Sequence, residues 1–287
     1  MPETFVDLGS VDVPSGVLVL GMAGWIDYWR ELGQPLSERA RAAAATGGGH
    51  LRESLCEAVA VPAAADRPLK VRATASPSPF DEAPTIATLE ISLGVPWPRT
   101  VNRSVPVRLG DLPVDRCGMV IGDAAVLDTW TGMDGAPADG LADVFYWGRY
   151  ADDAQAQFGG ERIAKHGVAG PHGWLDLPLA EAAARASELT SWCDRLHGKG
   201  LMVSIDKHTD DHRFRRAGWH HPLRAGAIEV GGCQVLGIEW DQGDHSMRHR
   251  GERHADQVYP VTLEADEEGE TAMRWTIAPY DFDDEDE

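Results

Sequence analysis

Histidine binds metal ions and exchanges protons near neutral pH, and eight of the eleven histidines of this chain lie between residues 197 and 254. His208 and His212 are four residues apart, with Asp211 between them, and they follow directly on the apolar run Leu201–Ile205. A strand that ends in an acidic, histidine-bearing turn fixes the backbone and exposes metal ligands. On a helix, a spacing of four also places both imidazole rings on one face.

These residues suggest a divalent-metal site, for zinc or manganese, built on His208, Asp211 and His212. Zinc requires a further protein ligand, for which His220, His221 and His245 are the candidates, and His245 is the one that we select. A bound ion lowers the pKa of its water and so supplies a nucleophile near neutral pH. This hypothesis predicts a metal-dependent hydrolytic enzyme, in which catalytic residues beyond the ligands are unknown.

The same segment has a second interpretation that needs no metal. Thr209 can cap a short helix over Thr209–Ala217, with two aspartates at its amino end and Arg215 and Arg216 at its carboxyl end, before Gly218 stops it. Every residue type then has a structural role, and no cofactor is expected.

A further group of aromatic and polar side chains follows in two loops, and we predict that it forms a partner or ligand surface. Its members are Trp219, His220, His221, Trp240, Asp241 and Asp244.

The elements that must position these residues indicate an α+β fold, mainly antiparallel sheet. Alternating apolar and polar residues, many glycines and many prolines favour short strands. One long amphipathic helix is expected at about 177–197, packed on the sheet. Asp176 is its expected cap, and its apolar stripe consists of Ala182, Ala186, Leu189, Cys193 and Leu196.

A loop at residues 132–140 is the best candidate for a boundary. It divides the chain into a β-rich N-terminal half with short helices, 1–135, and an α+β C-terminal half, 136–280, although one continuous domain is also possible. Residues 281–287 are expected to be a disordered acidic tail.

The formal net charge of −20 restricts the class of partner. Eleven acidic residues and one arginine in 264–287 contribute −10 of it. Phosphate binding needs a basic patch, so nucleic acid is not expected, whereas a cationic protein would be attracted. No run of apolar residues is long enough for a membrane span, and the four cysteines form no C-x-x-C pair, so we expect a cytoplasmic protein without membrane contact.

The segment Gly237–Asp244, followed by the strand that begins Val258-Tyr259-Pro260-Val261, contains a W-x-x-G-D element. It resembles the closing hairpin of uncharacterised bacterial, actinobacterial-like β-rich proteins, some of which are immunity-protein-like. The opening Pro14-Ser15-Gly16-Val17-Leu18 is similar to theirs. The resemblance covers about a sixth of the chain, and His245 replaces the usual second glycine.

From acidity, this resemblance and the absence of a complete catalytic motif, we predict an acidic cytoplasmic binding protein, immunity- or antitoxin-like, that neutralises a cationic protein partner. The alternative is the metal-dependent hydrolase centred on His208, Asp211 and His212. A small-molecule-binding protein or a cofactor-free enzyme built around the tryptophans and histidines is the third possibility.

Overall fold

The computed structural model describes residues 5–53, 56–76, 84–98, 100–113, 118–132, 135–163, 172–239, 258–266 and 269–277. Within these ranges the strands form three sheets, and all neighbouring strands are antiparallel. The predicted α+β class with mainly antiparallel sheet is therefore confirmed. No helix among the described residues is long and apolar enough to span a membrane.

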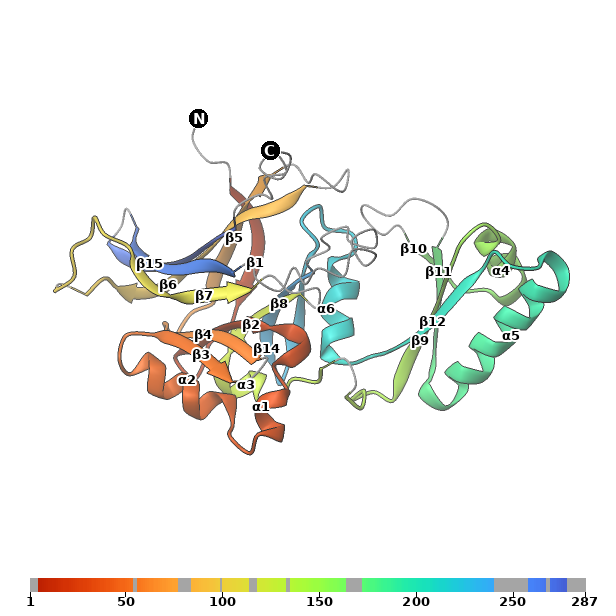
Figure 1. Cartoon of the computed structure of the whole chain (residues 1–287), viewed down its shortest axis with the longest axis horizontal. Helices are drawn as coiled ribbons and strands as arrows, with labels where there is room; N and C mark the ends of the chain where they lie inside the picture. Colours follow the sequence, from red (N-terminus) through yellow and green to blue (C-terminus); the bar gives the residue numbers. More distant parts are fainter. Residues whose placement is uncertain are drawn as a thin grey trace, which may run out of the picture.

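Two six-stranded sheets form the larger part of the molecule (Figure 1). In spatial order, the first consists of β1 (Phe5–Val11), β5 (Leu69–Ser76), β6 (Thr85–Pro96), β16 (Glu270–Thr276), β15 (Val258–Ala265) and β7 (Val107–Pro113). The second consists of β13 (Ala225–Val230), β14 (Cys233–Ile238), β8 (Met119–Asp123), β2 (Val17–Met22), β4 (Cys56–Pro62) and β3 (Gly49–Glu53).

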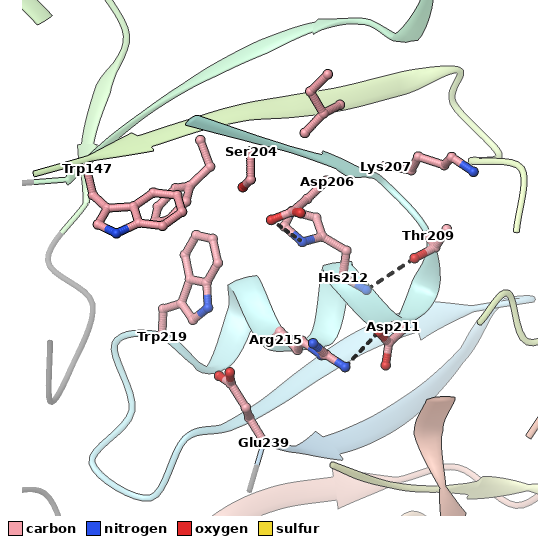
Figure 2. A pocket seen from close by; sticks show the side chains of 12 residues that line it. Trp147, Ser204, Asp206, Lys207, Thr209, Asp211, His212, Arg215, Trp219 and Glu239 are labelled. Atoms are coloured by element: carbon pink, nitrogen blue, oxygen red, sulfur yellow. Dashed lines mark hydrogen bonds and ion pairs between the residues drawn. The ribbon is translucent and has the colours of Figure 1, made fainter. Parts of the chain in front are cut away.

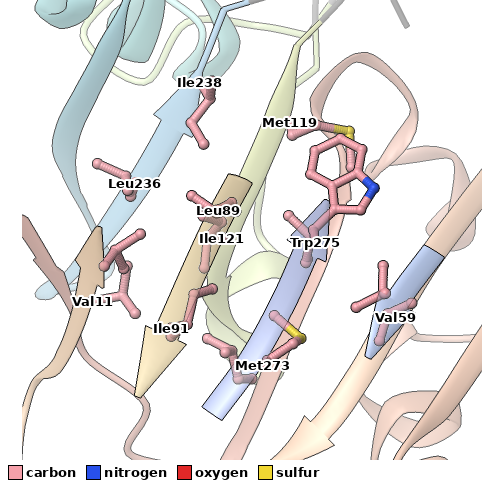
Figure 3. Packing of buried hydrophobic residues seen from close by; sticks show 14 of the residues in the cluster. Val11, Val59, Leu89, Ile91, Met119, Ile121, Leu236, Ile238, Met273 and Trp275 are labelled. Carbon is pink, nitrogen blue, oxygen red and sulfur yellow. The ribbon is translucent and has the colours of Figure 1, made fainter. Parts of the chain in front are cut away.

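The main hydrophobic core lies between these two sheets. Leu89, Ile91 and Trp275 of the first sheet pack with Ile121 and Leu236 of the second, and each is at most 1% exposed (Figure 3). A second core covers the other face of the second sheet, where helices pack against it. These helices are η1 (Ala23–Trp25), α1 (Tyr28–Glu31), α2 (Leu36–Ala44), α3 (Ala124–Leu127) and α6 (Asp210–Gly218). The second sheet is thus buried on both faces, which explains the uninterrupted apolar sequence of β2.

A third, four-stranded sheet is built from one contiguous segment, residues 141–207. In spatial order its strands are β10 (Glu161–Ile163), β11 (His172–Pro178), β9 (Leu141–Trp147) and β12 (Met202–Lys207). Helices α4 (Ala151–Phe158) and α5 (Leu179–His197) pack on one of its faces through a small core of their own.

The predicted long helix is present as α5, but two details of its prediction are wrong. It begins at Leu179 after Pro178, because Asp176 belongs to strand β11 and does not cap it. Leu196 is 63% exposed and is not part of the core under the helix, whereas Ala182, Leu189 and Cys193 are buried as the stripe predicts.

The expected halves, 1–135 and 136–280, do not correspond to separate sheets. Strand β14 pairs with β8, and β16 pairs with β6, so strands from the C-terminal half complete sheets begun in the N-terminal half. The loop composition at 132–140 marks a real departure of the chain toward the four-stranded sheet. The amino-acid composition of this loop does not show which strands pair after the chain returns from the four-stranded sheet. The 281–287 tail lies outside the described residues.

Helix α6 lies between the second sheet and the four-stranded sheet (Figure 1). Its backbone rests directly on β13 and β14, because two glycines leave room for it. A Cβ atom at Gly226 would lie 2.5 Å from the Gly218 nitrogen, and one at Gly237 would overlap the Phe214 ring. One side of α6 is therefore seated on the hairpin, and the other side faces the four-stranded sheet.

Candidate functional site

The candidate site lies between α6 and the face of the four-stranded sheet opposite α5. Side chains alternate along β9: Ala142, Val144 and Tyr146 pack with α4 and α5, while Asp143 and Phe145 point toward α6. The alternation places a buried carboxylate on the face that α6 covers.

The sheet register then aligns three aspartates across neighbouring strands. Asp143 of β9 is paired with Asp176 of β11 on one side and with Asp206 of β12 on the other. Like charges directly opposite one another destabilise a sheet, and Asp143 is completely buried. This row of three aspartates, Asp176–Asp143–Asp206, therefore requires positive charge from outside the sheet.

His208 and His212 lie against this row of aspartates. His208 Nε2 lies 2.9 Å from Asp143 Oδ1, and His212 Nε2 lies 2.7 Å from Asp143 Oδ2. Both imidazoles are buried, and their rings stack with centroids 5.8 Å apart. One ligand atom from each of these three residues falls within 4.8 Å of the others, so among the described residues they form a group that can hold a metal ion.

The outer nitrogens of the two imidazoles also face carboxylates. His208 Nδ1 is 3.2 Å from Asp139 Oδ2, and His212 Nδ1 is 3.9 Å from Asp206 Oδ2. A metal-binding histidine commonly donates its second N–H to such a carboxylate, which fixes its tautomer and orientation.

The charges shift the pKa values of the cluster in opposite directions. Burial alone would raise the pKa of Asp143, but hydrogen bonds with His212 and His208 outweigh it and hold the pKa below its usual value. Burial opposes protonation of His208, yet the contacts with Asp143 and Asp139 raise its pKa. Without a metal, the cluster thus favours ionised Asp143 beside protonated His208.

Arg216 brings a permanent positive charge, one turn of α6 after His212. Its Nη1 lies 3.2 and 3.3 Å from the two Asp143 oxygens and 3.4 Å from His208 Nε2. Its guanidinium carbon lies 4.1 Å from the centroid of the Trp174 ring, a cation–π contact.

The start of α6 fixes the positions of both histidines. The Thr209 hydroxyl accepts a hydrogen bond from the His212 backbone N–H, so the predicted cap is confirmed. The predicted stop at Gly218 is wrong, because Gly218 belongs to the helix and Trp219 follows in helical conformation. The Asp210 N–H donates to Thr131 Oγ1 and the Thr131 N–H donates to Asp210 Oδ2, at 2.7 and 3.0 Å. The two interpretations of the segment are thus compatible, since the same capped helix presents the metal-ligating side chains.

A pocket of about 410 Å³ adjoins the cluster, with His212 among its lining residues. Phe145, Trp147 and Trp219 form an aromatic wall on one side, with Phe145 packed 4.9 Å from Trp147 and 5.8 Å from Trp219 between ring centroids. Figure 2 shows Ser204 and Asp206 projecting from β12 toward α6 beside His212. The pocket therefore combines an apolar wall with polar groups near the imidazoles.

Asp211 was predicted to be a metal ligand, but the carboxylate that lies with the two histidines is Asp143. Asp211 is buried against Arg215, whose Nη2 is 3.0 Å from Asp211 Oδ2 (Figure 2). Burial raises the pKa of Asp211 to about 6, despite the lowering effect of Arg215. The reason is helical geometry: adjacent residues do not share a face of a helix, so Asp211 points away from the side that carries His212.

Of the other predicted site residues, the structure describes Trp219, His220 and His221. Trp219 is buried in the pocket wall, His220 is exposed, and the His221 ring accepts a hydrogen bond from the Leu223 N–H within its own loop. The remaining predicted residues, Trp240, Asp241, Asp244 and His245, lie outside the described residues.

Asp143 is the functional candidate that sequence reasoning missed. It stands 65 residues before His208 in the chain, so no local spacing connects the two. One signal was available: Asp143 is the single charged residue in the otherwise apolar strand Leu141–Trp147. A charge in such a strand must be paired if the strand is buried.

No protein-family model, curated protein or solved structure matches the chain.

Proposed function

We propose that the chain is a divalent-metal-dependent enzyme of the hydrolytic type, with Asp143, His208 and His212 as metal ligands. The observation that carries the proposal is the arrangement of carboxylates around the imidazoles. Both Nε2 atoms meet the same buried carboxylate, and both Nδ1 atoms face a carboxylate of their own.

A neutral His208 cannot satisfy this arrangement. Whichever of its ring nitrogens lacks the proton turns its lone pair toward a carboxylate, Asp139 at Nδ1 or Asp143 at Nε2. A second proton on the ring removes this conflict, and so does one divalent ion between the Nε2 atoms and Asp143. Metal binding by histidine needs the deprotonated ring, so the ion would take the place of protons.

The donor set favours a transition metal over calcium or magnesium. Two imidazole nitrogens and one carboxylate oxygen suit zinc, manganese or iron, whereas calcium and magnesium prefer oxygen alone. Ligand atoms at about 2.0–2.2 Å from one ion lie roughly 3.0–3.4 Å apart. The Asp143–imidazole distances of 2.7 and 2.9 Å are close to this range, so small movements would complete the site.

Three protein ligands leave room for water, and this is the composition of catalytic rather than structural sites. A bound ion would lower the pKa of that water to about 7 and make it a nucleophile. Because His212 also lines the pocket, the water would lie near its inner end, while the aromatic wall would bind an apolar part of the substrate.

The test starts from protein purified without a histidine tag and stripped with a chelator. Zinc and manganese are added back, and bound metal is measured by elemental analysis and calorimetry. Hydrolysis is followed with p-nitrophenyl carboxylic and phosphoric esters. We expect stoichiometric metal and metal-dependent hydrolysis, both lost in His208→Ala/His212→Ala and kept in the exposed-site control His220→Ala. Failure of the wild-type chain to bind either metal would refute the proposal.

A second candidate function is the binding of a cationic protein, as an immunity-like protein would do. It is supported by the formal charge of −20, half of which falls within residues 264–287. Titration with a basic protein such as lysozyme and with an acidic protein of similar size, at low and high salt, measures how selective the charge is. Selective, salt-sensitive capture of a specific basic partner without any bound metal would favour this candidate over the enzyme.

A further inference from the structure

From the contacts of Arg216 we infer that its guanidinium occupies the metal position until a divalent ion displaces it, after which Asp176 becomes an additional ligand. This inference rests on the proposed metal site and concerns how that site is filled. It makes Arg216 a residue that sets metal affinity and Asp176 a ligand that only the metal-bound form uses.

The position of Nη1 is the first support. It lies 3.2–3.4 Å from Asp143 Oδ1, Asp143 Oδ2 and His208 Nε2, which are the atoms that would bind the ion. A metal ion about 2.0–2.2 Å from the same atoms would lie within contact distance of this nitrogen. The guanidinium offers donors and no lone pair for a metal, so the two cations exclude one another.

Arginine cannot leave the site by losing a proton, unlike the histidines, because it stays charged at any physiological pH. It must therefore move. Its contacts with the carboxylates are long for charge-assisted hydrogen bonds, which are usually about 2.7–2.9 Å. Its contact with the face of Trp174 is close, at 4.1 Å from the ring centroid. The side chain can thus leave Asp143 and remain held by Trp174.

Asp176 is the second support. Its Oδ1 lies 3.0 Å from His208 Nε2, and its Oδ2 lies 3.5 Å from Arg216 Nη2. The distance of 3.0 Å is typical of two ligand atoms on one ion. The distance of 3.5 Å shows that the same carboxylate pairs with Arg216 when no ion is bound. When Arg216 moves away, Asp176 is free to bind the ion, and the row of three aspartates supplies two of the ligands.

The test compares metal affinity with metal-free stability in Arg216→Met, which keeps a long side chain over Trp174 but removes the charge. Arg213→Met is the control, because Arg213 lies on the same helix and pairs with Asp210 and the Glu229 carbonyl, outside the cluster. Zinc and manganese binding is measured by calorimetry, and metal-free stability by thermal unfolding in a chelator.

We expect Arg216→Met to bind zinc at least about tenfold more tightly than the wild-type chain, because a cation no longer competes for the ligands. The same variant should unfold at a lower temperature without metal, because the aspartates lose a counter-charge. Asp176→Asn should weaken binding by about tenfold. The control Asp152→Asn should leave it unchanged, since Asp152 pairs with Arg162 on the surface.

The outcomes separate this inference from the proposed function. Equal or weaker zinc binding by Arg216→Met, with normal binding by the wild-type chain, overturns the inference and leaves the metal site intact. Binding by Arg216→Met but not by the wild-type chain shows that the ion does not displace the arginine, which overturns the inference and refutes a metal function for the natural sequence. If neither binds, both ideas fail.

Discussion

Two of the three sheets carry a row of charged side chains across three neighbouring strands, and the sign pattern differs between them. In the first sheet Glu90 lies between Arg72 and Arg274, and both arginines contact its carboxylate. In the four-stranded sheet Asp143 lies between two other aspartates. The central carboxylate is buried in both rows.

The difference shows how structural and candidate functional charges can be told apart. Opposite charges on neighbouring strands attract one another, so the Arg72–Glu90–Arg274 row is balanced within its own sheet. The row of three aspartates is balanced by groups outside its sheet, from His208 and from α6, and a sheet built for stability alone would not need such an arrangement. Negative charge that the strands of a sheet do not neutralise among themselves indicates a position where a cation binds.

The largest expected effect on stability comes from a substitution in the Arg72–Glu90–Arg274 row. Glu90→Gln should lower the free energy of unfolding of the metal-free chain by about 2 kcal/mol, because two arginines lose their hydrogen bonds to a charged, buried carboxylate. Asp143→Asn should cost about 1 kcal/mol or less, because it also removes repulsion from Asp176 and Asp206. Urea unfolding in a chelator measures both. A larger loss for Asp143→Asn would contradict the comparison.

Bound metal should reverse which of the two substitutions, Glu90→Gln or Asp143→Asn, destabilises the chain more. Zinc at a hundred times its dissociation constant should stabilise the wild-type chain by about 2.7 kcal/mol. Glu90→Gln should keep this gain, and Asp143→Asn should lose it. Thermal unfolding with and without zinc provides the measurement, and an equal gain in both variants would place the metal elsewhere.

In the metal-free chain, the stability that the aspartate row and His208 contribute should depend on pH. The raised pKa of His208 means that its stabilisation is complete below the unfolded-state value of about 6.5 and is lost as pH rises through the folded-state pKa. The lowered pKa of Asp143 means that its stabilisation is lost only at acidic pH, below about 4. Stability should therefore fall from pH 6 to 8, and less so in His208→Gln. A fall of the same size in His208→Gln would assign the dependence to other groups.

The smallest effect is expected at the edge of the aspartate row. Asp206 is partly exposed, and Asp206→Asn should raise the metal-free stability by about 0.2–1 kcal/mol because it removes one like-charge neighbour. Asp152→Asn, on the surface of α4, is the matched control and should have no such effect. A loss of stability in Asp206→Asn would show that its contact with His212 outweighs the repulsion.

Local patterns in the sequence predicted the parts of the site that are close together in the chain. The strand–turn–helix that carries His208 and His212, its Thr209 cap and the apolar stripe of α5 all follow from residue spacing. Asp143 and Asp176 could not be found in this way, because they join the histidines only through strand pairing. Pairing depends on the whole set of strands, and no short window of sequence contains it.

The predicted ligand Asp211 lies outside the group of Asp143, His208 and His212 for a related reason. Residues next to one another on a helix point in different directions, so the carboxylate adjacent to His212 in sequence does not lie with the two rings. The carboxylate that contacts the two histidines comes from strand β9, far from them in the chain. The predicted immunity-like function, the cationic partner and the cytoplasmic location remain predictions.

The glycines under α6 have a consequence for how distant relatives of this chain can be found. Gly226 and Gly237 accept no side chain without moving α6, yet neither contacts a metal-ligating atom. A homologue that keeps the geometry must then keep them, whereas its surface histidines are free to vary. A useful search pattern would combine a lone aspartate in an apolar strand, the spacing His-x3-His-x3-Arg, and two glycines eleven positions apart in the hairpin that follows.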